Sequence, residues 1–318
     1  MDKVRQLFVS FGSLNAFSKC PRYYWYKHIR RLELVKFNIA FTIGRIMHHG
    51  IQVLFESPKK AEEEIKKKFK EEAQNARKQF PQMGIDDEQE LAQQEFISVG
   101  MLRAFRAYYS KFLKETTHIS TEFSIKYQLN PQVTVVGKID NIIANFKKLY
   151  IYELKNLKSF DMSRIQSIKT DPQTSLYFEL YNRMAKKADR LNGIIYKIIK
   201  KPQIRQKQSE SKGEFLRRLE GWYEDRGETK FHLERLNAPF ISGEAVLNSV
   251  DKVSKRMLAN GFSKEEYYQD FSYCVHDWGL CQFYGLCHEG GETPANMKLY
   301  KIRPKFKVQE EGGAEKDG

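Results

Sequence analysis

The chain has 318 residues, of which 41% are hydrophobic, so it can bury one large core or two ordinary ones and is not disordered as a whole. Lys and Arg outnumber Asp and Glu by 54 to 40, and the resulting charge of +14 favours a polyanionic partner, most simply nucleic acid. No apolar run of about eighteen residues occurs, which excludes a membrane-spanning helix.

The first third of the chain is predicted to be helical. Ser13 is a candidate N-cap for a short helix over 12–29, and apolar spacing predicts a second helix over 42–56. Two longer helices are expected over about 59–80 and 87–115. The charges of 59–80 have mixed signs, a pattern typical of a solvated helix face.

The middle of the chain changes to strand patterns. Strands are expected over 119–129, 133–144 and 148–154, and the short NFKK segment predicts a hairpin between the last two. A helix over 173–187 and a strand over 192–199 follow.

The last third is predicted to return to helices. After a polar loop over 200–213, helices are expected over 214–224 and 243–260, then a loop-like cysteine segment. Residues 304–318 are predicted to be a disordered tail. The fold class is therefore α+β, a mixed α/β arrangement with a central mixed sheet flanked by helices.

Acidic side chains and a lysine occur at two neighbouring predicted strands. Asp140 lies near the end of one strand, and Glu153 and Lys155 lie two apart on the next, so these two share a face. Two carboxylates suit Mg²⁺ or Mn²⁺, and a water near Lys155 could then attack a phosphodiester. The alternative is that Glu153 and Lys155 form an ordinary surface pair.

Three further residues extend this constellation. His48 is on the predicted helix 42–56 and could complete a metal site with preference for Mn²⁺, although the adjacent His49 leaves the choice open. Gln173 and Tyr177 are four apart, hence on one helix face, and could bind a phosphate or the lysine. Their alternative is helix packing.

The four cysteines are unevenly placed along the chain. Cys20 stands in SKCPRYYWY, whereas Cys274, Cys281 and Cys287 fall close together near the C-terminus. Four thiols are the number that a tetrahedral metal or an iron–sulfur cluster needs. The N-terminal residues lack a signal-peptide pattern, so we expect an intracellular, cytoplasmic protein with reduced thiols.

In chain order the motifs are CPRYYWY, G-x-x-x-H, G-x-x-D, E-x-K, Q-x-x-x-Y and three late cysteines. This order resembles that of the PD-(D/E)XK nuclease superfamily, over residues from about 10 to 290. Within it, the chain is similar to the RecB-like, AddB-like branch with an iron–sulfur staple. That branch includes CRISPR-associated adaptation nucleases and mitochondrial exonuclease-five-like enzymes.

The resemblance implies a restriction-endonuclease-like core and a role for each motif residue. Lys155, Asp140 and Glu153 would be catalytic, and Gln173 and Tyr177 would position DNA. The implied metal ligands are His48, Asp140, Glu153 and the backbone carbonyl of Leu154. The implied ligands of a [4Fe–4S] cluster are Cys20, Cys274, Cys281 and Cys287.

Two departures from the branch pattern concern the cysteines and the acidic residue. The late cysteines are spaced C-x₆-C-x₅-C instead of C-x₂-C-x₅-C, so four extra residues within VHDWGL would have to bulge out. His276 and His288 lie nearby and could replace a thiolate in a zinc site. The second departure is Glu153, where the branch usually has Asp.

The resemblance predicts one nuclease domain over 1–303, with a helical insertion at about 57–116 and a cluster region at 12–30 plus 270–290. We expect a Mg²⁺- or Mn²⁺-dependent exonuclease that acts on single-stranded DNA or DNA ends in replication, recombination or repair. A bacterial or phage origin fits this expectation. The alternative is a non-catalytic or zinc-stapled nucleic-acid-binding subunit of the same fold.

Partners of such a nuclease are DNA and, because no Walker A motif is present, a separate helicase or recombination protein. The aromatic run at 23–26 can stack on bases or pack a core. A basic stretch can follow the DNA backbone or form a solvated loop; it comprises Lys197, Lys200, Lys201, Arg205 and Lys207.

Overall fold

The computed structural model describes residues 6–35, 39–79, 85–157, 161–261, 263–276 and 279–304. The chain divides into two compact units. The first consists of Met1–Phe11 and Lys36–Lys255, and the second of Gly12–Val35 and Arg256–Gly318. The single domain expected over 1–303 stays a prediction, and the expected tail lies outside the described residues from residue 305 onward.

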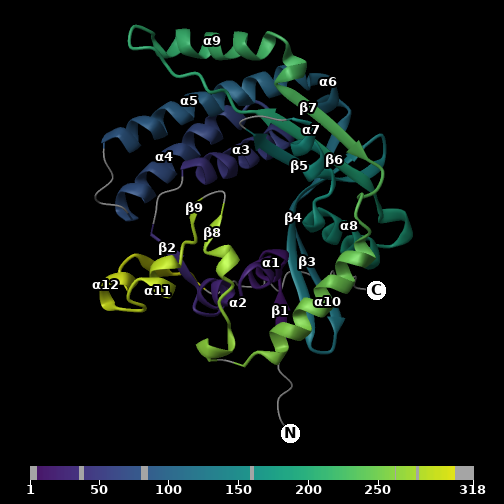
Figure 1. The fold of residues 1–318 in the computed structure, drawn as a ribbon. Coiled ribbons are helices and arrows are strands. Elements are labelled where there is room, and N and C mark those ends of the chain that lie inside the picture. The colour runs from purple at the N-terminus through teal and green to yellow at the C-terminus, as the bar shows by residue number, and fades with distance from the viewer. Residues whose placement is uncertain are drawn as a thin grey trace, which may run out of the picture. The chain divides into compact units, whose positions relative to one another are not determined.

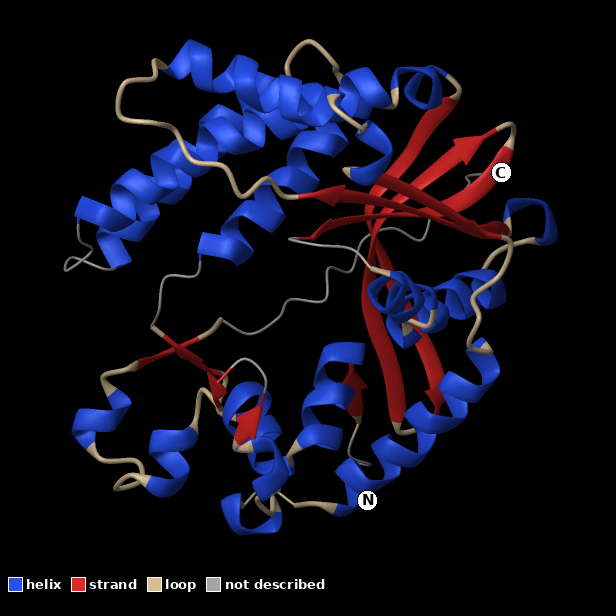
Figure 2. Ribbon diagram, turned by 45° about the horizontal axis from the view of Figure 1, so that its top comes forward, coloured by secondary structure: helices blue, strands red, loops and turns tan. Residues whose placement is uncertain are grey.

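A six-stranded mixed sheet forms the centre of the first unit (Figures 1 and 2). Its order is β1-β4-β5-β6-β7, and β3 pairs with β4. The β1–β4 and β5–β6 pairs are parallel, and the other pairs are antiparallel. The strands are β1 (Leu7–Val9), β3 (Thr116–Asn130), β4 (Val133–Asn145), β5 (Lys148–Leu157), β6 (Leu191–Lys200) and β7 (Phe231–Leu236).

Helices surround this sheet, so the mixed α/β class is confirmed. They are α3 (Ile39–Glu56), α4 (Ala61–Gln79), α5 (Ile85–Tyr108), α6 (Ser110–Lys114), α7 (Met162–Lys169), α8 (Pro172–Met184), α9 (Lys212–Glu224) and α10 (Gly243–Ala259), which continues into the second unit.

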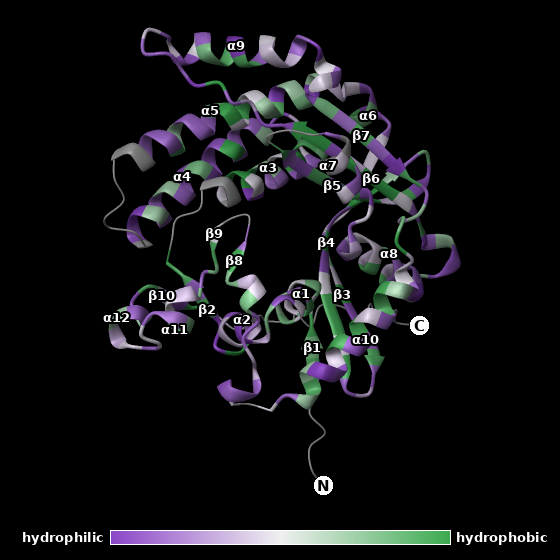
Figure 3. Cartoon of the chain, in the orientation of Figure 1, coloured by the Kyte–Doolittle hydropathy of each residue, from purple (hydrophilic) through white to green (hydrophobic). Residues whose placement is uncertain are grey.

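One hydrophobic core joins α3, α4, α5 and α9 to the sheet. Their apolar side chains meet Tyr152 and Leu154 of β5 and Ile195 and Ile199 of β6. In Figure 3 the hydrophobic colour gathers on β5 and β6, whereas much of α4 is hydrophilic. Because side chains alternate along a strand, Glu153 on β5 points away from this core. α8 packs against β3, β4 and β6.

The hairpin between β4 and β5 sets the position of the acidic residues. Phe146 and Lys147 form its loop with φ of 50° and 61°, as a two-residue turn of the left-handed type requires, and the hairpin expected at NFKK is confirmed. Pairing of β5 with β4 ends at Tyr152, whereas pairing with β6 continues to Leu157. The two strands therefore separate just where Asp140 and Glu153 lie.

The second unit is built from both ends of the described chain. Its elements are α1 (Phe11–Lys19, with Phe11 from the first unit), α2 (Pro21–Tyr24), β2 (Leu32–Leu34), β8 (Val275–His276), β9 (Gly279–Leu280), α11 (Tyr284–His288), α12 (Pro294–Met297) and β10 (Tyr300–Ile302). β2 pairs with β10, and β8 pairs with β9, both antiparallel.

Aromatic rings form the core of the second unit. Phe17 contacts Tyr24 edge to face at 5.5 Å between ring centroids, and Tyr26 contacts Phe283 at 5.2 Å. Tyr24, Trp25 and Tyr26 are buried, so the aromatic run packs this core. The helix expected over 12–29 is interrupted at Pro21, after which a short α-turn leads into a π-helical turn over Trp25–Ile29.

Candidate functional site

The structure gathers the predicted site residues of the first unit at the place where β4 and β5 separate. Asp140 is on β4, and Glu153, Leu154 and Lys155 are on β5. The other three come from helices, His48 from α3 and Gln173 and Tyr177 from α8.

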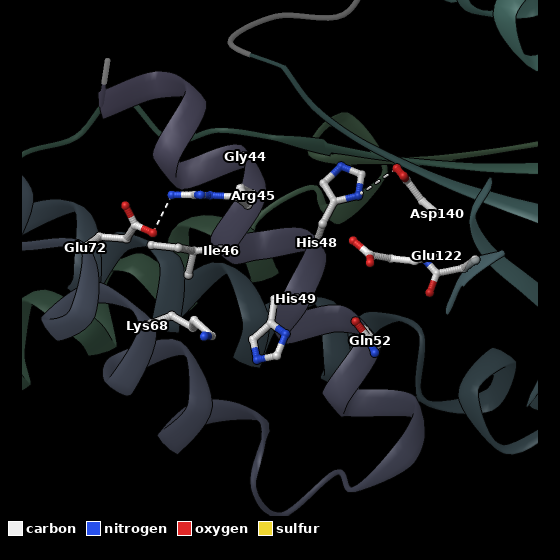
Figure 4. Close-up of a pocket in the computed structure, with 11 residues that line it drawn as sticks. Gly44, Arg45, Ile46, His48, His49, Gln52, Lys68, Glu72, Glu122 and Asp140 are labelled. Carbon is white, nitrogen blue, oxygen red and sulfur yellow. Dashed lines mark ion pairs between the residues drawn. The ribbon is translucent and has the colours of Figure 1, made fainter. Parts of the chain in front are cut away.

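His48 and Asp140 contact one another at the wall of an open pocket (Figure 4). Their Nδ1 and Oδ2 atoms are 3.3 Å apart, and the two side chains are 30% and 49% exposed. The hydrogen bond from His48 lowers the pKa of Asp140, and the charge of Lys155 adds to this effect. His49 turns instead to Glu64 at 3.7 Å, so His48 is the histidine that contacts the acidic group.

Glu153 and Lys155 form a close pair on β5. Lys155 Nζ donates a hydrogen bond of 2.6 Å to Glu153 Oε1, and the side chains are only 33% and 15% exposed. Burial raises the pKa of Glu153. Burial alone would lower the pKa of Lys155, but the charge of Glu153 and the hydrogen bond outweigh it and raise that pKa. Lys155 is therefore a cation at neutral pH.

The start of α8 brings two more polar groups to this site. Asp171 caps the helix by accepting hydrogen bonds from Gln173 N at 2.9 Å and Thr174 Oγ1 at 3.1 Å, and its charge also acts on Lys155. Burial, followed by the charge of Asp140, raises the pKa of Tyr177 to about 12. Tyr177 thus keeps its hydroxyl proton and can donate a hydrogen bond.

Gly137 explains how Tyr177 comes so close to β4. A Cβ at this position would lie 2.5 Å from the Tyr177 ring, which no real contact allows. The glycine that interrupts the predicted strand therefore marks the approach of a helix side chain to the strand.

The pocket in front of His48 and Asp140 has a volume of about 670 Å³. Its lining includes five residues that the sequence interpretation missed: Arg45, Gln52, Lys68, Glu72 and Glu122. On α3 a signal was present, because Arg45, His48, His49 and Gln52 follow the i, i+3, i+4, i+7 spacing of one helix face. Lys68 and Glu72 lie on α4, whose mixed charges had suggested only a solvated face.

The donor atoms fit a hard divalent cation in kind. Carboxylate oxygens suit Mg²⁺ or Mn²⁺, and the imidazole nitrogen shifts the preference towards Mn²⁺. Within the part of the chain that the structure describes, however, no group of three or more His, Cys, Asp or Glu side chains forms a ready metal site. Glu153 is engaged by Lys155 instead, so a cation would have to share that carboxylate with the lysine.

The comparison with protein families agrees with this geometry. A family model described as the PD-(D/E)XK nuclease superfamily matches residues 9–288, a span that includes every site residue above. The chain belongs to the PD-(D/E)XK nuclease superfamily. No curated protein matches the chain. Superfamily members are typically metal-dependent phosphodiesterases, so membership suggests nuclease activity and a nucleic-acid substrate.

This superfamily member gathers its four cysteines in the second unit. Cys20, Cys274, Cys281 and Cys287 line one small pocket together with His288. Burial raises the pKa of the Cys287 thiol to about 11, and the charges of the other three cysteines act on it. Cys20 Sγ accepts hydrogen bonds of 3.4 Å from Tyr23 N and Asp270 N.

A small hairpin absorbs the long interval between two of these cysteines. β8 and β9 pair directly after Cys274 and directly before Cys281, and Cys281 N donates a hydrogen bond of 2.9 Å to Cys274 O. The pairing of β8 with β9 brings Cys274 and Cys281 together at its base. The Nε2 atom of His288 lies 3.3 Å from Cys274 Sγ.

The basic stretch of the sequence begins inside β6, which contains Lys197 and Lys200. Lys197 is completely buried, so its predicted contact with a DNA backbone is wrong. Its strand lies within the sheet, between β5 and β7, and its side chain points into the apolar core.

Among the described helices, none is long and apolar enough to cross a membrane.

Proposed function

We propose that this chain is a Mg²⁺- or Mn²⁺-dependent deoxyribonuclease that removes nucleotides from single-stranded DNA or DNA ends. The observation that carries the proposal is the meeting of Asp140, Glu153 and Lys155 where β4 and β5 separate, with His48 of α3 beside Asp140. The net charge of +14 supports a nucleic-acid substrate.

The residues divide the chemical work in this proposal. His48, Asp140, Glu153 and the carbonyl of Leu154 would hold the cation, which supplies Lewis-acid stabilisation of the phosphoryl oxygens. Lys155 orients the attacking water and stabilises negative charge on the phosphate. Gln173 and Tyr177 donate hydrogen bonds to the DNA backbone near the cleaved bond.

The proposal is tested with end-labelled single- and double-stranded DNA, each with free and with blocked ends, in Mn²⁺ or Mg²⁺. We expect products that shorten stepwise from free ends, and no cleavage in EDTA. Equal cleavage of blocked or circular DNA would replace the exonuclease mode by an endonuclease mode. If neither metal supports any cleavage, the non-catalytic nucleic-acid-binding subunit becomes the better description.

We also propose that the four cysteines hold a [4Fe–4S] cluster, as in the RecB-like, AddB-like branch. Their shared pocket and the two backbone hydrogen bonds to Cys20 Sγ support it, because such bonds stabilise ligating sulfur. A zinc site that uses His288 is the alternative, since this ring contacts Cys274.

Absorbance separates the two metals. Protein purified without oxygen is expected to be brown, with a broad band near roughly 400 nm. Cys20→Ser is expected to lose this band and to lower the melting temperature, because a ligand that joins distant parts of the chain restricts the unfolded state. His288→Ala should keep the band. A colourless protein with one zinc per chain, lost in His288→Ala, would refute the cluster.

The proposal also includes a location, a biological role and a protein partner. The location is cytoplasmic, and the processes served are replication, recombination or repair. Since the sequence lacks a Walker A motif, DNA unwinding would come from a separate helicase partner.

A further inference from the structure

The pocket in front of Asp140 has a basic side as well as an acidic one. Arg45 of α3 and Lys68 of α4 line it together with Glu72, away from the His48–Asp140 pair (Figure 4). Arg45 is three residues before His48, so the two side chains leave the same helix face about one turn apart. The basic side of the pocket therefore begins about one helical turn from the candidate cleavage site.

Among the described residues, each of the two cations is held by a partly exposed ion pair. Arg45 pairs with Glu72 and is 56% exposed, and Lys68 pairs with Glu71 at 2.7 Å and is 38% exposed. Ion pairs with exposed side chains contribute little to the stability of a fold. A phosphate of a DNA strand that enters the pocket can therefore replace these carboxylates at little cost.

We propose that Arg45 and Lys68 form a phosphate subsite that holds the substrate strand beside the bond to be cleaved. Arg45 and His48 are about one helical turn apart on α3, which is about 5.4 Å along its axis. The subsite therefore binds a phosphate near the cleaved one on the same strand. This inference rests on the proposed function, because it gives that pocket a nucleic-acid substrate.

The two side chains suit a phosphate in complementary ways. The planar guanidinium of Arg45 can donate two parallel hydrogen bonds to phosphate oxygens, and Lys68 adds a mobile point charge. Glu72 weakens phosphate binding, because its carboxylate pairs with the Arg45 guanidinium in the absence of substrate and repels the phosphate. Removal of Arg45 and removal of the charge on Glu72 should therefore change binding in opposite directions.

The test measures kcat and KM on a fluorescent single-stranded oligonucleotide in Mn²⁺. For the double variant Arg45→Ala/Lys68→Ala we expect KM to rise about tenfold, with kcat within about twofold of the parent. Glu72→Gln should lower KM about two- to threefold, by removing the competing charge. If the Arg45–Glu72 ion pair served only to join α3 to α4, the double variant and Glu72→Gln would change KM in the same direction.

A second readout does not depend on cleavage. In a Lys155→Ala background, fluorescence anisotropy gives the affinity for the same oligonucleotide as a function of salt. Loss of each phosphate contact should reduce the steepness of log K against log salt by about 0.7. Because this assay needs no turnover, an inactive parent would contradict the proposed function while the subsite is still tested.

The matched control is Arg77→Ala. Arg77 is also on α4, is 60% exposed and pairs with Glu88 at 2.7 Å, but it is not among the residues that line the pocket. It should leave KM and the salt dependence unchanged. The inference is overturned if the double variant behaves like Arg77→Ala, or if Glu72→Gln raises KM as the double variant does. Should the double variant fail to fold, Glu72→Gln and Arg45→Lys decide the question.

Discussion

Lys155→Ala is expected to lower kcat for DNA hydrolysis by about 10³-fold while DNA binding changes little. Lys155 Nζ lies 2.6 Å from Glu153 Oε1, and the charge of Glu153 keeps the lysine protonated although it is largely buried. In the proposed reaction, the Lys155 ammonium group stabilises the negative charge that develops on the phosphate during attack by water. Single-turnover cleavage in Mn²⁺, together with anisotropy for binding, measures the two effects separately.

Lys148→Ala is the matched control for this loss. Lys148 begins the same strand β5 but is exposed at the hairpin, far along the strand from Glu153. This variant should keep the parent rate. A Lys155→Ala protein that folds and still cleaves at the parent rate would show that the active site has been assigned to the wrong residues.

Lys197→Met is expected to stabilise the protein at neutral pH. Lys197 is 0% exposed, lies 3.3 Å and 3.8 Å from the ring centroids of Tyr109 and Phe112, and its Nζ has no hydrogen-bond partner among the described residues. Burial, followed by the charge of Arg235, lowers its pKa to about 6. The aromatic faces favour an ammonium group but do not replace the lost hydration.

The pH dependence of stability distinguishes this effect from better packing. In the unfolded chain the lysine keeps its ordinary pKa near 10.4, so between pH 6 and 10 the unfolded state binds more protons. The contribution of Lys197 to the free energy of unfolding therefore rises with pH through this window, by up to about 1.4 kcal/mol per pH unit. Below pH 6 both states are protonated, and its contribution is constant.

Urea unfolding at several pH values between 6 and 10 measures the prediction. At pH 7 Lys197→Met should raise the free energy of unfolding by about 2 kcal/mol or more, because methionine fills a similar volume without a charge to desolvate. The gain should shrink as the pH rises. Lys187→Met, at an exposed position, should show neither change. A gain of the same size at every pH would contradict the proposed neutral lysine.

The sequence predicted the central strands and the acidic group for a clear physical reason. The spacing of apolar residues fixes strands as long as β4 and β5, and the motif order places Asp140 and Glu153 at their point of separation. Strands such as β1 and β2 were missed, because three residues are too few to show a period. β7 was missed because its pattern is irregular: the apolar Leu233 is exposed, and the charged Glu234 and Arg235 follow one another.

The walls of the pocket could not be predicted from local sequence. Lys68 and Lys197 are both lysines in basic surroundings, yet one lines an open pocket and the other is buried. Only the packing of α4 beside α3, and the place of β6 inside the sheet, separates these environments. Similarly, the bond between Arg45 and Glu72 joins two helices that no periodicity relates.

The pairing of β8 with β9 allows the number of residues between Cys274 and Cys281 to vary while the two cysteines stay close together. Since β8 and β9 pair immediately next to the two cysteines, an insertion that preserves this pairing should keep Cys274 and Cys281 together. Motif searches that demand a fixed interval here would overlook such chains. An epitope or a fluorophore inserted there would report on this protein without replacing any of its four cysteines.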